Sequence, residues 1–183
     1  MKKIFLILLI SGFALAARAQ LYVAGDSSTV SFFSEAPLEN IDATNNKVNS
    51  FLNTSTNEVM FIVHIRGFTF NKDLMQEHFN EKYMESDKYP TATFKGKIND
   101  TVDYSKDGTY SVTATGKLMI HGVEREINAP GTITIEKGKI NLKSEFRVPL
   151  KGFNIEVPKL VFQNIAEVIS VKVNMNYSPY KKK

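Results

Sequence analysis

Three histidines are the side chains best suited to metal or acid–base chemistry in this sequence. His64, His78 and His121 lie far apart along the chain, and no two of them have the spacing of a ligand pair. The chain has no cysteine, which excludes both thiolate ligands and disulfide bonds. Two histidines from different segments can still meet in a folded chain. From the sequence, however, we expect no metal site, no cofactor and no catalytic residue.

A second group of titratable residues lies between positions 77 and 89. It contains Glu77, Glu81, Lys82, Glu85, Asp87 and Lys88. Paired carboxylates can act as general acid and base, but neighbouring opposite charges are more typical of a solvated helix surface. Tyr83 and Tyr89 can donate hydrogen bonds to a ligand head group, or simply pack their rings at a corner. We therefore interpret this group as the outer face of a short helix.

The first nineteen residues are typical of an export signal. Lys2 and Lys3 precede an apolar run that ends near Ala17, and Ala17-Arg18-Ala19 has the small-x-small form of a cleavage site. The apolar run is short for a membrane span. The sequence therefore predicts a signal peptide over residues 1–19 and one domain over residues 20–183. This domain is expected to be periplasmic or secreted, with no stable membrane anchor.

The charge of the mature chain is small. The sequence has 23 Lys and Arg against 19 Asp and Glu, and three of the basic residues belong to the expected leader. A body close to neutral, with no basic stripe, does not suit nucleic-acid binding. The oligomeric state is left open between a monomer and a homodimer.

Alternation of apolar and polar residues with a period of two dominates residues 20–183. Turn signals such as Asp107-Gly108 and Lys137-Gly138 separate about eight expected strands. The expected strands cover residues 29–34, 59–65, 94–98, 110–120, 123–129, 132–136, 139–148 and 169–177. A sheet with one dry and one wet face must cover the dry face, and closure into a barrel also removes free edges. The predicted fold is all-β: an eight-stranded antiparallel barrel with a short helical crossover.

Three segments depart from this alternation. Residues 71–83 favour a helix with Asn71 as its N-cap, which we expect to cover one mouth of the barrel. Residues 149–167 hold two prolines and many large apolar side chains, and we expect this segment to cover the other mouth. Residues 35–53 are rich in Asn, Thr and Ser, and are interpreted as loops around one short strand.

The inward face of the predicted barrel is almost wholly apolar. A barrel of eight strands is either filled by its own side chains or holds one small ligand, and 13 phenylalanines are enough to fill it. A hollow interior would bind a hydrocarbon by burying apolar surface. The candidate ligand-binding residues are Phe61, Val63, Phe94, Val112, Leu118, Ile120, Phe146 and Val171.

Several ordered motifs resemble one family, the YceI-like polyisoprenoid-binding proteins of bacteria. The first is residues 61–98, in which Gly67-Phe68-Thr69-Phe70 precedes Phe79-Asn80 and Tyr89-Pro90. The others are residues 116–125, 146–155 and 165–171. The resemblance implies a lipocalin-like barrel with an isoprenoid chain, such as a polyprenyl or quinone tail, in its lumen. Residues 26–32 depart from the family pattern because they lack its usual histidine.

The function predicted from the sequence is therefore binding of an isoprenoid or other long-chain lipid by an exported protein that is not an enzyme. One alternative is a cyclase or hydrolase that acts on a lipid inside the lumen, which requires a polar catalytic group pointing inward. The other alternative is a stress-protective or interaction module with a solid core.

Overall fold

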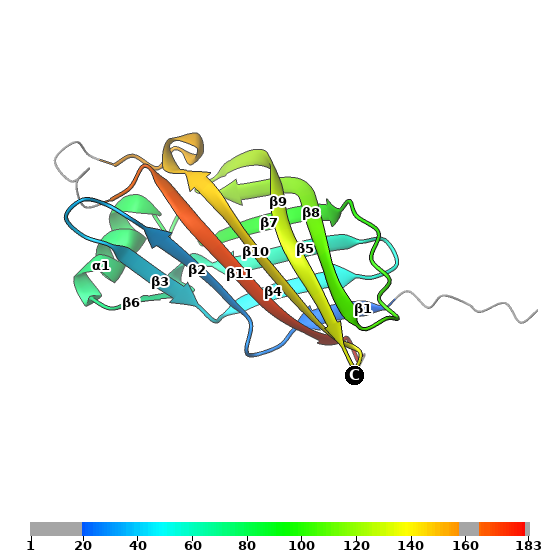
Figure 1. Ribbon diagram of the computed structural model, residues 1–183. Helices are drawn as coiled ribbons and strands as arrows, with labels where there is room; N and C mark the ends of the chain where they lie inside the picture. Colours follow the sequence, from blue (N-terminus) through cyan, green and yellow to red (C-terminus); the bar gives the residue numbers. More distant parts are fainter. Residues whose placement is uncertain (1–19, 158–164, 182–183) are drawn as a thin grey trace, which may run out of the picture.

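The computed structural model describes residues 20–157 and 165–181, and most of this chain forms antiparallel strands (Figure 1). Pairing of the first strand with the last closes the sheet into a barrel. The eight strands around the barrel are β1 (Leu21–Ala24), β4 (Val48–Asn53), β5 (Glu58–His64), β7 (Thr91–Ile98), β8 (Gly108–Ile120), β9 (Val123–Glu136), β10 (Lys139–Pro149) and β11 (Val168–Pro179). The predicted eight-stranded barrel is confirmed. The predicted signal peptide, residues 1–19, lies outside the described residues.

Three short strands lengthen the barrel wall. β2 (Thr29–Ser34) pairs with β11, β3 (Ile41–Asn45) pairs with β2, and β6 (Phe68–Phe70) pairs with β3. Each short strand is separated from a barrel strand by a break: β2 follows β1, β3 precedes β4, and β6 follows β5. The break before β6 is the 3₁₀ turn η1 (Ile65–Gly67).

The expectation of one short strand between residues 35 and 53 is wrong, because both β3 and β4 lie there. Their inward positions include the polar residues Asn45 and Ser50, which interrupt the apolar alternation, so the segment resembles a loop in sequence. Asn45 is fully buried at the break between β3 and β4. Its amide donates to the His64 carbonyl at 2.8 Å and its side-chain oxygen accepts from the Lys47 N–H at 2.8 Å. These bonds satisfy backbone groups that the broken strands leave unpaired.

β9 is one continuous strand, whereas the sequence predicted two strands on either side of Pro130. Pro130 is tolerated because it pairs only with β8. The pairing of β10 with β9 begins at Gly131, so no ladder on that side includes Pro130. The first part of β9 and the last part of β10 therefore separate. The turn η3 (Leu150–Phe153) lies beside this gap, and Arg125 of β9 donates from Nε to the Gly152 carbonyl at 3.0 Å.

The apolar segment after β10 lies at the same end of the barrel as the helical crossover, and not at the other mouth as the sequence suggested (Figure 1). Its residues 158–164 lie outside the described residues. Leu150, Phe153 and Ile155 are 8%, 2% and 4% exposed. These side chains belong to the hydrophobic core beside β9 and β10, which explains the large apolar residues in the described part of the segment.

The crossover (residues 71–90) contains the helix α1 (Asp73–His78) and the π-helical turn η2 (Phe79–Tyr83). The predicted helix is confirmed, but its N-cap is Lys72 and not Asn71, and no side chain caps it. In Figure 1, α1 lies at the end of the barrel opposite the C-terminus. Among the described residues, no helix has the length and apolarity needed to cross a bilayer.

Candidate functional site

The half of the barrel nearest the crossover encloses a cavity of about 540 Å³, which we call the lumen. Its volume falls within the range of small-molecule sites, roughly 300–1,000 Å³. All eight candidate residues line it: Phe61, Val63, Phe94, Val112, Leu118, Ile120, Phe146 and Val171. Whether these residues contact a ligand stays a prediction.

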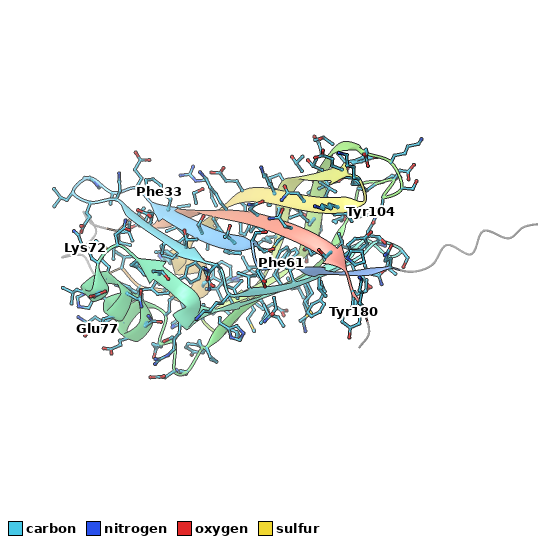
Figure 2. The ribbon with its side chains drawn as sticks, turned by 90° about the horizontal axis from the view of Figure 1, so that it is seen from below. Phe33, Phe61, Lys72, Glu77, Tyr104 and Tyr180 are labelled. Atoms are coloured by element: carbon cyan, nitrogen blue, oxygen red, sulfur yellow. The ribbon has the colours of Figure 1, made fainter. Side chains whose placement is uncertain are left out.

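The ladder register explains why these side chains face the same interior. Phe61 of β5 pairs directly with Phe94 of β7, and Phe94 pairs with Leu118 of β8. Residues directly opposite in a ladder point to the same face of the sheet. The Phe61 and Phe94 rings pack with centroids 6.1 Å apart. Figure 2 shows Phe61 between the end that carries Lys72 and Glu77 and the end that carries Tyr104 and Tyr180.

Four phenylalanines that the sequence reasoning missed form an aromatic cluster beneath the crossover. Phe79 of η2 packs against Phe32, Phe68 and Phe70, with ring centroids 5.0–5.6 Å apart. All four rings also line the lumen. Because Phe79 contacts rings from both β2 and β6, the cluster attaches the crossover to the barrel wall. Two features of the sequence could have indicated this cluster: Phe68 and Phe70 lie on one face of an alternating segment, and Phe79 lies on a face of the predicted helix.

The titratable side chains that line the lumen all come from its rim. They are Glu39, Lys72, His78 and Tyr83, from the loop after β2 and from the crossover. Lys72 Nζ lies 2.5 Å from Glu39 Oε1, which joins these two segments across the mouth. The His78 ring is 3.0 Å from Lys82 Nζ. Burial raises the pKa of the Tyr83 phenol, which therefore stays protonated at neutral pH.

The barrel strands contribute no titratable group to the lining. Both serine hydroxyls that line it already have partners: Ser34 Oγ accepts from the Ala166 N–H at 2.8 Å, and Ser144 Oγ donates to the Pro130 carbonyl at 2.6 Å. The depth of the lumen therefore offers mainly apolar surface. Polar contacts with a guest are available chiefly at the mouth.

The opposite half of the barrel is packed by its own side chains. Leu52, Ile133 and Met175 are wholly buried there and lie outside the lumen lining. Tyr177 is also buried, and its hydroxyl lies 2.6 Å from Ser50 Oγ. Burial raises the pKa of Tyr177, and that of Tyr104 to about 12. The solid-core interpretation thus describes one half of the interior, and the hollow interpretation describes the other.

The three histidines occupy separate places. His64 is exposed on the outer face of β5, and His78 lies at the mouth. His121 is in the turn between β8 and β9, where Nε2 lies 2.8 Å from Glu85 Oε2 and Nδ1 lies 3.3 Å from the Phe153 carbonyl. It therefore joins the crossover to η3. Within residues 20–157 and 165–181, no group of three or more His, Cys, Asp or Glu side chains is placed to hold a metal ion.

Solved structures of the same architecture come from several bacteria. The chain is similar to a polyisoprenoid binding domain from Saccharophagus degradans, with a TM-score of 0.75, 13% identity, and coverage of 89% of this chain and 100% of that one. It is also similar to Burkholderia cenocepacia BcnA, with a TM-score of 0.71, 16% identity, and coverage of 82% and 96%. The Campylobacter jejuni YCEI protein matches with a TM-score of 0.56, 16% identity, and coverage of 72% and 78%. At these identities the likeness concerns the fold alone.

The sequence itself carries a stronger match. A search of curated proteins finds no match, but the YceI-like domain family matches residues 22–177. This range begins in β1 and ends in β11, so it includes every strand of the barrel as well as the crossover. The closed barrel, its crossover and its lumen are therefore those of a YceI-like domain, and the chain belongs to the YceI-like family.

Proposed function

We propose that this protein binds an isoprenoid-type lipid, such as a polyprenyl or quinone, and holds its tail in the lumen. The observation that carries the proposal is the 540 Å³ cavity lined almost entirely by apolar side chains. Removing a hydrocarbon tail from water into such a cavity stabilises the complex by roughly 25 cal/mol per Å² of buried apolar surface. The similar domain from Saccharophagus degradans, described as polyisoprenoid binding, supports the same ligand class.

The proposed role is binding without catalysis. Glu39, Lys72, His78 and Tyr83 lie at the rim, where they would contact a head group and not the tail. In this arrangement Tyr83 donates a hydrogen bond to the head group, and the pair of Lys72 with Glu39 borders the entrance. The crossover acts as a lid, held on one side by the Phe79 ring contacts and on the other by the contact of Glu85 with His121.

We further propose that the protein is exported and works in the periplasm or outside the cell. The support is the basic and apolar leader with its small-x-small site before Gln20. N-terminal sequencing of the protein purified from its host tests this part separately. A mature N-terminus at Gln20 is expected, and a retained Met1 would refute export through cleavage.

Two measurements test lipid binding. Native mass spectrometry of protein purified from its host is expected to detect a bound lipid that organic extraction releases. Addition of a prenol or a quinone to delipidated protein is expected to raise the melting temperature, because a ligand that binds only the folded state stabilises it. If no lipid co-purifies and neither class of compound changes the melting temperature, the proposal fails.

A matched pair of substitutions on β5 locates the binding to the lumen. Val63→Trp places a large ring in the cavity, whereas Ile62→Trp places the same ring on the outer face of the same strand, outside the lining. We expect Val63→Trp to lose the lipid-induced rise in melting temperature and Ile62→Trp to keep it. Equal behaviour of the two variants would mean that the lipid binds elsewhere.

A further inference from the structure

The lumen ends before the packed half of the barrel on each strand that lines it. The last lining residues before the packed half are Val59 of β5, Ile98 of β7, Val112 of β8 and Leu142 of β10, and we call these four the lumen floor. Each is only 1–7% exposed even though it borders the cavity. The next inward residues do not line the cavity and are 0–2% exposed: Leu52 of β4, Ile133 of β9, Ile140 of β10 and Met175 of β11.

Strand pairing places residues of the packed half directly beside two of the floor residues. Val59 pairs with Leu52, and Leu142 pairs with both Ile133 and Met175. Each of these pairs places a lining residue beside a residue of the packed half. The floor residues do not pair with one another: Val59 pairs with Gly96 and Ile98 pairs with Ala114, so the boundary shifts by two residues from β5 to β7 and again from β7 to β8. A stagger between neighbouring strands is expected in a barrel, because its strands are tilted against the axis.

Hydrogen bonds stabilise the packed half beneath the floor. The Tyr177 hydroxyl bonds to Ser50 Oγ at 2.6 Å, and the Tyr104 hydroxyl donates to the Asn57 side chain at 3.1 Å. Tyr177 is buried and Tyr104 is half-buried, so a lipid tail that entered this half would have to displace satisfied polar groups. Within the described residues the lumen therefore has a closed bottom, and a tail enters and leaves at the crossover end.

The depth of the lumen follows from the strand geometry. On β8 the lining runs from Val112 to Ile120. At about 3.4 Å per residue, and with the tilt of about 40° that barrel strands have, this stretch spans about 20 Å along the barrel axis. The hydrocarbon part of one bilayer leaflet is about 15 Å thick. The lumen is therefore about as deep as one extended tail of ordinary membrane length.

We propose that the lumen floor sets the maximum length of the bound tail, so that the ligand is a single-tailed lipid whose tail is about one leaflet long. This inference rests on the proposed function and makes it more specific. A shorter tail leaves the bottom of the lumen empty, and a longer tail leaves its last units outside the mouth. Ile98 is the floor residue whose truncation deepens the lumen most directly, because its side chain is buried between the lumen and the packed half.

Competition between prenols of different length tests the floor. Delipidated protein is mixed with equal amounts of geraniol, farnesol, geranylgeraniol and solanesol, and native mass spectrometry measures the occupancy by each. Each buried methylene is worth about a fourfold gain in affinity. We expect occupancy to rise steeply up to geranylgeraniol and then to level off at solanesol, because the additional units of solanesol find no apolar surface inside.

Two variants change the floor in opposite directions. Ile98→Ala is expected to raise the occupancy by solanesol relative to geranylgeraniol. Ala129→Leu adds a side chain to the lining of β9 close to the floor, and is expected to make the occupancy level off already at farnesol. The melting temperature of each variant reports whether it folds, and Ala129→Leu creates no cavity, so it keeps the test valid if Ile98→Ala is too unstable.

The outcomes separate this inference from the proposed function. If the wild-type protein binds no prenol, lipid binding itself fails. If it binds prenols but occupancy keeps rising through solanesol, or if the folded variants keep the wild-type preference, the floor does not limit tail length while lipid binding stands.

Discussion

The hydrogen bond between Tyr177 and Ser50 allows the stability of the packed half of the barrel to be measured. Ser50 Oγ lies 2.9 Å from the Met60 carbonyl, to which it donates its single proton. The Tyr177 hydroxyl, 2.6 Å away, must therefore be the donor to Ser50 Oγ. Tyr177→Phe removes the hydroxyl that donates to Ser50 and leaves the bond from Ser50 to the Met60 carbonyl. Ser50→Ala removes the partner of both the buried Tyr177 phenol and the Met60 carbonyl.

These different consequences set the expected magnitudes. Loss of one net hydrogen bond in Tyr177→Phe should lower the free energy of unfolding by about 1 kcal/mol. Ser50→Ala should lower it by about 2 kcal/mol, because a buried hydroxyl without a partner loses its hydration as well. In the double variant no phenol remains to be satisfied, so its loss should be about 1 kcal/mol smaller than the sum of the two single losses.

Urea unfolding measures these free energies, provided that the dependence on urea concentration stays the same in all variants. Tyr180→Phe is the matched control, because Tyr180 lies at the same end of the barrel but is 53% exposed. Its effect should stay within about 0.5 kcal/mol. If the losses of the two single variants simply add, the two side chains are not coupled, and the buried bond does not stabilise the packed half.

Three further predictions concern the tyrosines, the turn after β8 and the crossover. Burial raises the pKa of Tyr104 to about 12 and that of Tyr177 further. The stability that both protonated phenols provide below pH 10.0 should therefore be lost as the pH rises through these raised pKa values. Urea midpoints measured against pH check this, and Tyr177→Phe should make the loss smaller. Gly122→Ala should lower the free energy of unfolding by about 1–3 kcal/mol, because φ is +73° and a Cβ would lie 2.6 Å from the Tyr89 ring; an unchanged melting temperature would contradict this. Phe79→Ala should cost about 2 kcal/mol and speed amide hydrogen exchange in residues 73–83, and unchanged exchange there would show that the aromatic cluster does not hold the crossover.

The sequence predicted the barrel where strand residues alternate strictly. In β7, β8, β10 and β11 the inward residues are almost all apolar and the outward ones largely polar, so one period identifies both the strand and its inner face. This is why the eight candidate residues, chosen by alternation, all line the lumen. The pattern is weaker in β5, where Met60 and Ile62 also face outward.

Alternation failed where inward residues are polar or the strand is short. Asn45 and Ser50 are buried because they bond to backbone groups of neighbouring strands, which no local pattern can reveal. The Phe79 contacts were hidden for a related reason, since they join segments that are adjacent only after β2, β3 and β6 have paired. The position of the boundary between hollow and filled interior was equally out of reach, because it depends on the summed volumes of side chains from many strands.

Both described ends of the chain lie at the closed half of the barrel, where the Tyr180 N–H bonds to the Leu21 carbonyl at 2.7 Å (Figure 1). An affinity tag, a fluorescent label or a surface linker attached beyond either residue would therefore project away from the entrance. Protein immobilised in this way on a sensor chip would present its opening to the solution. Loading and release of lipid could then be followed in real time, without a matrix blocking the route that the guest has to take.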